Sequence, residues 1–388
     1  MRTKKAIIRQ LAGLSALLLI ATACGDGEEA VDEPDTTDEV EDEAEEEEAA
    51  ADEEESDDEA AEDAAFEGDP VTLTFAHYLP DGQGTVPEAR YAEVVNELTD
   101  GTVTIQIEWA GALGEPAELP FLVEGGAVDM AAIVPAFNVD AFPAISATQL
   151  IWWSSGDMET DLRRQHDLVI ETHGMDIFVD EWTSYNQRRL FVQNLPPYNF
   201  YSEDPDCSLD GLDGQRIRSL GRDLPRAFEE IGVTPLNLTT PEMYEGLDRG
   251  TVDRVTLPPQ VFMDGDFYEI ASYACGPIFW LGAGHTITIN LDTWDALSDD
   301  QREAMTVAAE QVTDFSLDFF IENEVETIAL HGDEGVEFQE FPAADFQELQ
   351  DVSPDFLEEW YLEREAAGQG DAALEVYEQM LEIREREY

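Results

Sequence analysis

A near-repeat inside the chain constrains its fold more than any other feature of the sequence. The segment EGGAVDMA at Glu124–Ala131 is echoed by DRGTVDRV at Asp248–Val255. Each copy follows a predicted helix and leads into an apolar strand, so the glycine suits a positive backbone dihedral at a helix end and the valine suits a sheet core. Coincidence between two ordinary helix–strand corners is one explanation. The other, which the repeat favours, is a chain built from two similar α/β lobes.

Local patterns predict an α/β unit around the first copy. Val71–Ala76 is an apolar, β-branched run followed by turn-forming residues at 80–84, which is typical of a strand. Pro87–Leu98 has the pattern of a helix, and Val103–Trp109 alternates as a second strand. Strand, helix and strand at this spacing predict a βαβ unit and a parallel sheet.

Two later helices carry start signals. Thr240 can cap the helix before the second copy of the repeat, and Gly250 suits its end. Ser298 and Gln301 form the pattern of a capping box. The helix that they begin extends from Asp299 to about Ile328, which is too long for an ordinary lobe helix.

The charge of the chain is distributed unevenly. Residues 1–24 hold four basic residues and no acid, residues 25–70 hold 26 acids and no base, and the remaining 318 residues hold 63 acids and 15 arginines. The overall net charge of -70 excludes a nucleic-acid-binding protein, because phosphate contacts need clustered Lys and Arg. Beyond residue 24 no lysine remains for a Schiff base or a phosphate-binding loop.

The N-terminal segment has the pattern of an export signal. Residues 1–23 combine a basic start, a short apolar run and small residues before Cys24, as a signal peptide does. The position of Cys24 resembles the lipidated cysteine of bacterial lipoproteins, which would anchor the protein to the cell membrane. The alternative is a secreted protein in which Cys24 lies inside the removed peptide. Residues 24–70 are then a lipidated cysteine and a disordered acidic tether, or alternatively an acidic interaction tail.

The two cysteines that remain, Cys207 and Cys275, are an even pair in an exported and oxidising setting. We therefore predict a disulfide between them.

The acidic surface, which has no lysine, has two possible explanations. One is adaptation to high salt, which screens carboxylate repulsion, and the other is a GC-rich genome that prefers arginine codons.

Six stretches together resemble a known family, the substrate-binding subunits of TRAP (tripartite ATP-independent periplasmic) transporters. They are TLTFAHYLP (Thr72–Pro80), GALGEPAE (Gly111–Glu118), GGAVDMA (Gly125–Ala131), LDGLDGQRIRS (Leu209–Ser219), TTPEMYEGLDRGTVDRV (Thr239–Val255) and NLDTWDALSDDQREAM (Asn290–Met305). The resemblance implies a bilobal periplasmic-binding-protein-like α/β fold, with a hinge and a long helix that spans both lobes. It places lobe I at 71–190 plus about 285–322, and lobe II at 191–284 plus about 323–388.

The resemblance also implies where a ligand binds. The family arginine that pairs with the substrate's carboxylate matches Arg218, and a second family arginine matches Arg188, with Arg189 as the competing choice. Arginine supplies charge and a planar fork, which an anionic ligand needs in so acidic a protein. The sequence departs from the family at Leu257, where a polar amide is usual, and at Thr240, where an aromatic residue is frequent. An apolar wall opposite an arginine favours a monocarboxylate with a small or hydrophobic body.

Aromatic residues near predicted loop ends are candidates for that apolar wall, with core packing as the alternative. They are Tyr78, Phe137, Trp153 and Trp182. Trp294, just before the capping box, is interpreted as a core residue.

No motif of an enzyme is present. The five histidines have no metal-ligand spacing, and no nucleophile elbow or His-Glu-x-x-His motif occurs. We therefore predict a binding protein that has no cofactor, no metal and no catalytic residue, and that passes a small organic acid to the membrane subunits of a TRAP transporter. The alternatives are the binding protein of an ABC-type importer and, from another class, a secreted hydrolase. The match at Asn290–Met305 and the long helix argue against the importer.

Overall fold

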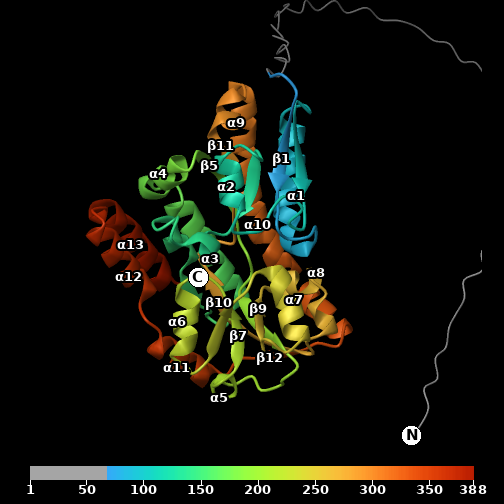
Figure 1. Cartoon of the computed structure of the whole chain (residues 1–388), viewed down its shortest axis with the longest axis vertical. Helices are drawn as coiled ribbons and strands as arrows, with labels where there is room; N and C mark the ends of the chain where they lie inside the picture. Colours follow the sequence, from blue (N-terminus) through green and yellow to red (C-terminus); the bar gives the residue numbers. More distant parts are fainter. Residues whose placement is uncertain (1–67) are drawn as a thin grey trace, which may run out of the picture. The chain divides into compact units, whose positions relative to one another are not determined.

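The computed structural model describes residues 68–388, which belong to one compact unit, Asp63–Tyr388 (Figure 1). The predicted signal peptide, Cys24 and nearly all of the acidic tether lie outside the described residues. Within the described part of the chain, no helix has both the length and the apolar character that a membrane span requires.

The first sheet has the strand order β2-β1-β3-β11-β5. Its strands are β1 (Val71–Ala76), β2 (Val103–Glu108), β3 (Met130–Ile133), β5 (Gln187–Gln193) and β11 (His285–Asn290). β1 is parallel to β2 and β3, so the predicted βαβ unit is confirmed. The sheet as a whole is mixed, because β11 runs antiparallel to both β3 and β5.

The second sheet repeats this arrangement, although an isolated parallel bridge, and not a continuous ladder, joins its two parts. Its strands are β6 (Tyr198–Ser202), β7 (Arg216–Ser219), β8 (Thr234–Asn237), β9 (Val255–Leu257), β10 (Tyr273–Leu281) and β12 (Glu337–Glu340). β7 pairs with β8 and is linked to the β9 segment by a parallel bridge between Ile217 and Arg254. β9, β6, β10 and β12 then follow in order. β4 (Ile151–Trp153) lies within the range predicted for lobe I, yet it pairs with β10 of this second sheet.

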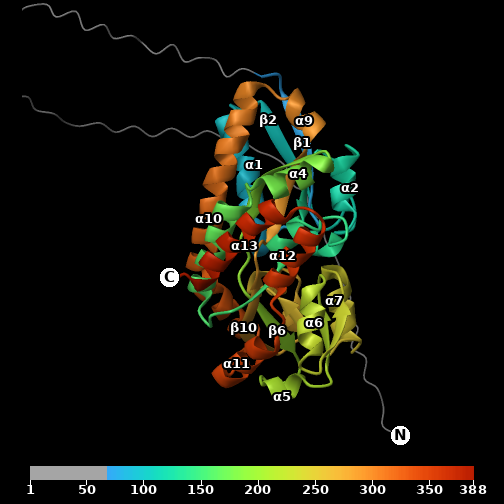
Figure 2. The same ribbon diagram turned by 90° about the vertical axis from the view of Figure 1, so that its left-hand side faces the viewer.

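Helices cover both sheets (Figures 1 and 2). Those of the first half are α1 (Val86–Leu98), α2 (Leu119–Glu124), α3 (Met158–Thr172), α4 (Asp176–Ser184), α5 (Leu209–Leu212), α6 (Asp223–Glu229), α7 (Thr240–Asp248) and α8 (Pro259–Asp264). Those of the second half are α9 (Leu291–Ala296), α10 (Asp299–Asp333), α11 (Ala343–Val352), α12 (Phe356–Ala366) and α13 (Gly370–Glu385).

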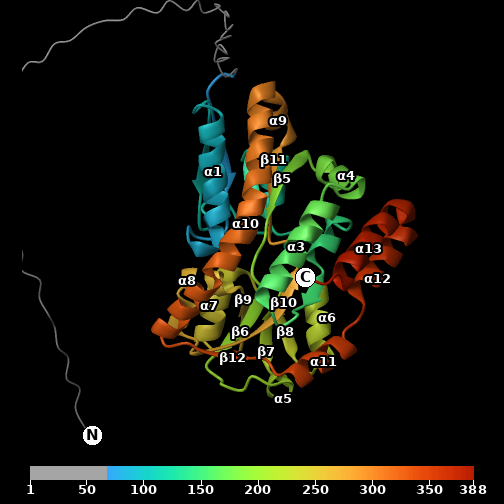
Figure 3. The same ribbon diagram turned by 180° about the vertical axis from the view of Figure 1, so that it is seen from behind.

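The long helix predicted from the sequence is α10, with 35 residues. The capping box is present, since Gln301 N–H donates to Ser298 Oγ at 3.1 Å and Ser298 N–H donates to Gln301 Oε1 at 3.0 Å. α10 packs on α1 and β5 of the first lobe and on α8 and β12 of the second (Figure 3). The helix therefore spans both lobes.

The near-repeat is a structural repeat. The backbone N–H of Thr74 donates to Asp129 Oδ2 at 2.9 Å, and that of Arg216 donates to Asp253 Oδ2 at 2.8 Å. In the reverse direction, Asp129 N–H donates to Thr74 O and Asp253 N–H to Arg216 O. Both corners thus tie a strand to its parallel neighbour through the same pair of hydrogen bonds. The similarity of the two segments is therefore a structural repeat and not a coincidence of sequence.

One helix start differs from the prediction. Thr239, not Thr240, caps α7, and the Glu242 carboxylate accepts the backbone N–H of Thr239 at 2.9 Å. Thr240 is the first helical residue, and its hydroxyl is not used in the cap.

The predicted disulfide is present. The structure joins Cys207 to Cys275, with 5.6 Å between the Cα atoms, so the loop after β6 is tied to β10. Trp294 is buried in the core of the first lobe, as expected.

Candidate functional site

A small cavity lies between the two lobes. Its volume is about 20 Å³, which is room for about one water molecule. Its walls come from the ends of β1, β3 and β11, from β7 and β9, and from the starts of α7 and α8. The lining residues are Tyr78, Leu79, Val134, Phe137, Leu195, Tyr198, Arg218, Leu220, Thr240, Leu257, Pro258, Val261, Gly284 and His285.

Arg218 is the cation of this cavity. It lies on β7 and is only 3% exposed. Its Nε donates to Leu238 O at 3.0 Å and its Nη1 to Thr256 O at 3.1 Å, whereas Nη2 has no hydrogen-bond partner among the described residues. No carboxylate of the described part of the chain forms an ion pair with it. Burial lowers the pKa of Arg218, while the nearby phenols Tyr198 and Tyr78 oppose that shift.

A buried guanidinium without an acid is unusual in a protein with this excess of carboxylates. The other arginine that is less than a tenth exposed, Arg254, has an ion-pair partner, Asp204, at 3.4 Å. Removing a cation from water costs free energy that a neighbouring anion offsets. Arg218 therefore has an unused capacity to bind an anion.

A chain of hydrogen bonds lies behind the opposite wall. The Tyr78 hydroxyl lies 2.9 Å from His285 Nε2, and His285 Nδ1 lies 2.8 Å from Glu88 Oε1. His285 Nδ1 also lies 3.0 Å from Oε1 of Gln193, whose amide N–H₂ donates to Gly84 O. Both neighbours of Nδ1 are thus acceptors, so Nδ1 carries a proton. In the neutral imidazole Nε2 then accepts the Tyr78 proton, and the Tyr78 oxygen retains acceptor capacity toward the cavity.

The carboxylate of Glu88 is held as an anion in the core. His77 Nδ1 accepts the Leu79 N–H at 3.0 Å, so its proton is on Nε2, which lies 3.4 Å from Glu88 Oε1. Burial alone would raise the pKa of Glu88, but the hydrogen bonds from His285 and His77 outweigh it and lower the pKa to about 2. Burial lowers the pKa of His77, with Glu88 opposing.

These three side chains are also the described residues that could hold a metal ion. One ligand atom each from His77, Glu88 and His285 lies within 4.8 Å of the others, and all three side chains are buried. A metal would need the lone pairs of the two ring nitrogens that here carry the protons shared with Glu88. The hydrogen bonds account for the cluster without an ion.

The remaining walls are apolar or weakly polar. Leu257 and Val261 face the cavity from β9 and α8, and Val134 and Phe137 face it from the segment after β3. Phe137 also meets Tyr78 edge-on, with 6.2 Å between ring centroids.

A direct contact closes one edge of the cavity. Asp264 of α8 accepts the backbone N–H of Gly84 at 2.7 Å and that of Gln83 at 3.0 Å. Gly84 O in turn accepts from Gln193 of the first lobe. This contact therefore links α8 of the second lobe to the segment after β1 of the first lobe, beside the cavity.

The structure brings most of the predicted ligand-binding residues together. Five of the seven line the one cavity: Tyr78, Phe137, Arg218, Thr240 and Leu257. Arg188 does not line it, because its guanidinium lies over the Trp294 ring, 4.6 Å from the centroid, and Arg188 and Arg189 line a different cavity. Trp182 of α4 does not line the cavity either, because its side chain is buried against the ring of Phe142. A ligand role for Arg188 and Trp182 stays a prediction that their placement does not support.

Other residues of the site were not found from the sequence. His77 lies beside Tyr78 in the TLTFAHYLP stretch, but Glu88 is 11 residues and His285 is 208 residues further on, so no local pattern shows that the three side chains meet. Trp153, a candidate for the apolar wall, lines a different cavity.

Two α/β lobes that close on a cavity with one unpaired cation define the class of extracytoplasmic solute-binding proteins. Residues 75–364 match the family described as bacterial extracellular solute-binding protein, family 7 (DctP). The chain belongs to this family, whose members are the solute receptors of TRAP transporters and work with membrane transporter subunits.

Relatives and solved structures agree with this assignment. A solute-binding protein of Roseobacter denitrificans is 22% identical over 289 residues, which are 74% of this chain and 86% of the relative. The ectoine-binding periplasmic protein TeaA of Halomonas elongata is 23% identical over 259 residues, 63% of this chain and 70% of TeaA. A TRAP periplasmic solute-binding protein of Desulfovibrio salexigens with bound orotic acid has a TM-score of 0.70 at 19% identity, and the match covers 80% of this chain and 99% of that one.

Proposed function

We propose that this protein captures a small monocarboxylate between its lobes, with Arg218 as the anchor for the carboxylate, and delivers it to the membrane subunits of a TRAP transporter. The observation that carries the proposal is the buried guanidinium of Arg218, whose Nη2 has no partner among the described residues. A carboxylate is one of the anions with which the planar fork of arginine pairs through two parallel hydrogen bonds.

The rest of the cavity narrows the ligand class. Its lining contains one arginine and no other arginine or lysine, so a second carboxylate on the ligand would have no cationic partner. The Tyr78 oxygen offers an acceptor, which suits a hydroxyl or amide N–H on the ligand. We therefore propose a compact monocarboxylate that carries one such donor, with Leu257 and Val261 against its apolar side.

Ligands of the neighbouring structures support the carboxylate. Those named are orotic acid, pyroglutamic acid and glucuronate, and each carries one carboxylate. Their sequence identity to this chain is 17 to 20%, so the choice of ligand here depends on this cavity and not on theirs.

The test is calorimetric titration of the purified protein, in molar salt, with a panel of monocarboxylic and dicarboxylic acids. A monocarboxylate that binds the wild type and is lost in Arg218→Gln supports the proposal. Arg216→Gln is the matched control, because Arg216 is on the same strand, is exposed and pairs with Asp253. If Arg218→Gln retains the affinity of the wild type, or if sugars and cations bind instead, the proposal is wrong.

The localisation has a separate proposal. We infer from the sequence around Cys24 that the mature protein is lipid-anchored at the outer face of the cell membrane. From its family we infer separately that it catalyses no reaction. Cys24→Ser should move the protein from the membrane fraction to the soluble fraction. Equal membrane association of both forms would contradict the anchor.

A further inference from the structure

The contact between Asp264 and the segment after β1 lies beside the cavity at Arg218, although Asp264 does not line that cavity. α8 meets the N-terminal end of α1 there, as Figure 3 shows. A short 3-10 helix, η1 (Gln83–Thr85), leads directly into α1. The first turn of a helix has backbone N–H groups with no acceptor inside the helix, and the side chain of the residue before the helix usually accepts one of them.

The residue before η1 cannot act as such a cap. It is Gly82, which has no side chain. The N–H groups of Gln83 and Gly84 donate instead to the carboxylate of Asp264, which belongs to the other lobe. Negative charge is favourable at the N-terminal end of a helix. A helix of the first lobe therefore receives its cap from the second lobe.

The close approach of α8 to this segment depends on glycine. A Cβ atom on Gly82 would overlap Cγ of Asp264, and a Cβ atom on Gly84 would lie 3.1 Å from Cγ2 of Val261. Gly82 has an extended backbone, with φ of 179°, which any residue adopts. An alanine at this position would therefore disturb the contact between the lobes and not the backbone of its own segment.

The contact also has an unfavourable side. Burial raises the pKa of Asp264, the N–H groups of Gly84 and Gln83 lower it, and the negative charges of Asp81 and Asp266 raise it again. Hydrogen bonds that desolvation and like charges oppose contribute a small net free energy. Such a contact can form and separate as the lobes move.

A chain of hydrogen bonds leads from this contact to the cavity. Gly84 O accepts from Gln193 Nε2 at 2.7 Å, and Gln193 Oε1 lies 3.0 Å from His285 Nδ1. The Tyr78 hydroxyl, which lines the cavity, lies 2.9 Å from His285 Nε2. On α8, Val261 lines the cavity from a position three residues before the carboxylate of the contact. The contact and the cavity thus share elements of both lobes.

We propose that Asp264 is a positioning residue for ligand binding: its carboxylate holds α8 of the second lobe against the start of α1, and this raises the affinity of the cavity between the lobes although Asp264 does not touch the ligand. This role rests on the proposed function, whereas the contact itself does not. Because coupling between two sites is reciprocal, a bound solute strengthens the contact by the same factor by which the contact strengthens binding.

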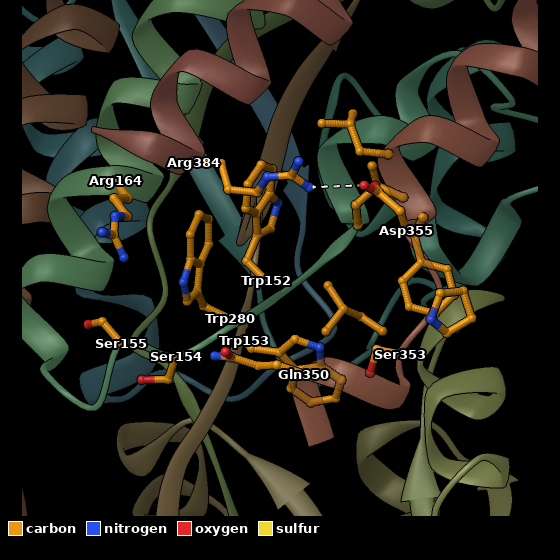
Figure 4. A pocket seen from close by; sticks show the side chains of 15 residues that line it. Trp152, Trp153, Ser154, Ser155, Arg164, Trp280, Gln350, Ser353, Asp355 and Arg384 are labelled. Carbon is orange, nitrogen blue, oxygen red and sulfur yellow. Dashed lines mark hydrogen bonds and ion pairs between the residues drawn. The ribbon is translucent and has the colours of Figure 1, made fainter. Parts of the chain in front are cut away.

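A larger cavity beside the C-terminal helices is separate from this contact (Figure 4). Its volume is about 430 Å³, and it shares no lining residue with the cavity at Arg218. Its lining includes the ion pair of Arg384 with Asp355, at 3.4 Å, and it includes neither Asp264 nor any residue of η1. A change of affinity caused at the contact therefore reports on the cavity between the lobes.

Small-angle X-ray scattering of the purified protein without ligand, in molar salt, tests the contact. Gly82→Ala puts a methyl group against Asp264, and Asp264→Asn removes the charge and one acceptor, so both variants should have a larger radius of gyration than the wild type. Gly174→Ala is the control for the first, because no atom lies within 4 Å of a Cβ there. Asp248→Asn, at an exposed position, is the control for the second. A radius of gyration equal to that of the wild type in both variants overturns the proposal.

The probe for binding is pyroglutamate, the acid named for two of the neighbouring structures. Gly82→Ala and Asp264→Asn should bind it about tenfold more weakly than the wild type, mainly through faster dissociation, and both control variants should bind it as the wild type does. Equal affinity of the two variants and the wild type overturns the proposal. If neither pyroglutamate nor any other carboxylic acid binds the wild type, the proposed function is wrong, and the scattering still decides whether Asp264 holds the lobes together.

Discussion

The two lobes use the same strand arrangement and differ in the chemistry at one position. The order β2-β1-β3-β11-β5 of the first lobe corresponds to β8-β7-β9-β6-β10 of the second, with the same parallel and antiparallel pairs. The shared Asp129 and Asp253 contacts align Thr74 with Arg216, and two residues further on they align Ala76 with Arg218. The cation at the cavity is therefore a side chain that only one lobe carries on a shared backbone.

The comparison explains how charge is divided across the cavity. The second lobe supplies Arg218, which has no carboxylate partner among the described residues. The first lobe supplies Tyr78, and its anionic Glu88 is buried further from the cavity, hydrogen-bonded to His77 and His285. The proposed anionic ligand would thus meet positive charge on one side and neutral groups on the other. Closure of the two lobes completes the site, as hinge motion does in binding proteins.

The largest expected difference between the lobes comes from the disulfide, since only the second lobe has one. Cys207 and Cys275 are 68 residues apart, so loss of the bond should lower the free energy of unfolding by about 4 kcal/mol in the chain-entropy model. Urea unfolding with and without reductant measures this, and the mass should rise by two protons on reduction. Equal urea midpoints for the two forms would contradict it.

The next effect belongs to the first lobe and depends on pH. Glu88 has a folded pKa of about 2 against an ordinary 4.5, so its stabilisation, about 3 kcal/mol, is complete above pH 4.5 and is lost as pH falls toward 2. His77, whose pKa burial lowers, adds a loss that begins as pH falls below its ordinary 6.5. Urea unfolding in molar salt from pH 7 to 3 should show both.

Variants separate these contributions. Glu88→Gln should remove the part below pH 4.5, whereas Glu97→Gln, an exposed carboxylate on the same helix, should leave the profile unchanged. A profile of Glu88→Gln that parallels the wild type at every pH would show that the cluster is not held as described.

A smaller effect separates the two buried arginines of the second lobe. Arg254→Met should lower the free energy of unfolding by about 2 kcal/mol, because Gln215 Oε1, Asp206 O and Asp204 lose their donor. Arg218→Met should lower it less, by about 1 kcal/mol, because the change leaves Leu238 O and Thr256 O without a donor but also removes a buried cation that no carboxylate compensates. Chemical denaturation of both variants measures the contrast, and equal losses would argue against a binding role for Arg218.

The smallest effect tests whether the corners are equivalent. Gly126 and Gly250 have φ of +68° and +65°, so Gly→Ala at either should cost about 1 kcal/mol, and the two costs should agree. Gly125→Ala is the control, because its φ of -79° suits any residue. Unequal costs at the two positions would show that the corners respond differently in spite of their shared geometry.

The sequence predicted much of the fold because the signals are local. The bounds of β1 are as predicted, those of α1 and β2 differ by one residue, and the start of α10 follows its capping box. The mixed first sheet was not predicted, since the partner of β3 is β11, far away in the chain. The pairing of β4 with β10 escaped prediction for the same reason.

The candidate site was predicted in part. Arg218, Leu257 and Thr240 belong to motifs that carry the family resemblance, and the structure places them on one cavity with Tyr78 and Phe137. The prediction for Arg188 shows what a local pattern cannot specify. Arg188 lies on β5 with its guanidinium over the ring of Trp294, and this contact depends on a segment far away in the chain.

By itself the sequence determined the repeated corner, the strands beside it and the long helix, and it predicted Arg218 and Arg188 as the cations for an anionic ligand. Only the tertiary structure decided that Arg218 has no carboxylate partner among the described residues, that Arg188 lies over Trp294, and that His285 reaches Glu88 across 197 residues. The physical reason is range. Propensity, capping and turn chemistry act between near neighbours in the chain, whereas burial, protonation and hydrogen-bond partners depend on which distant segments pack together.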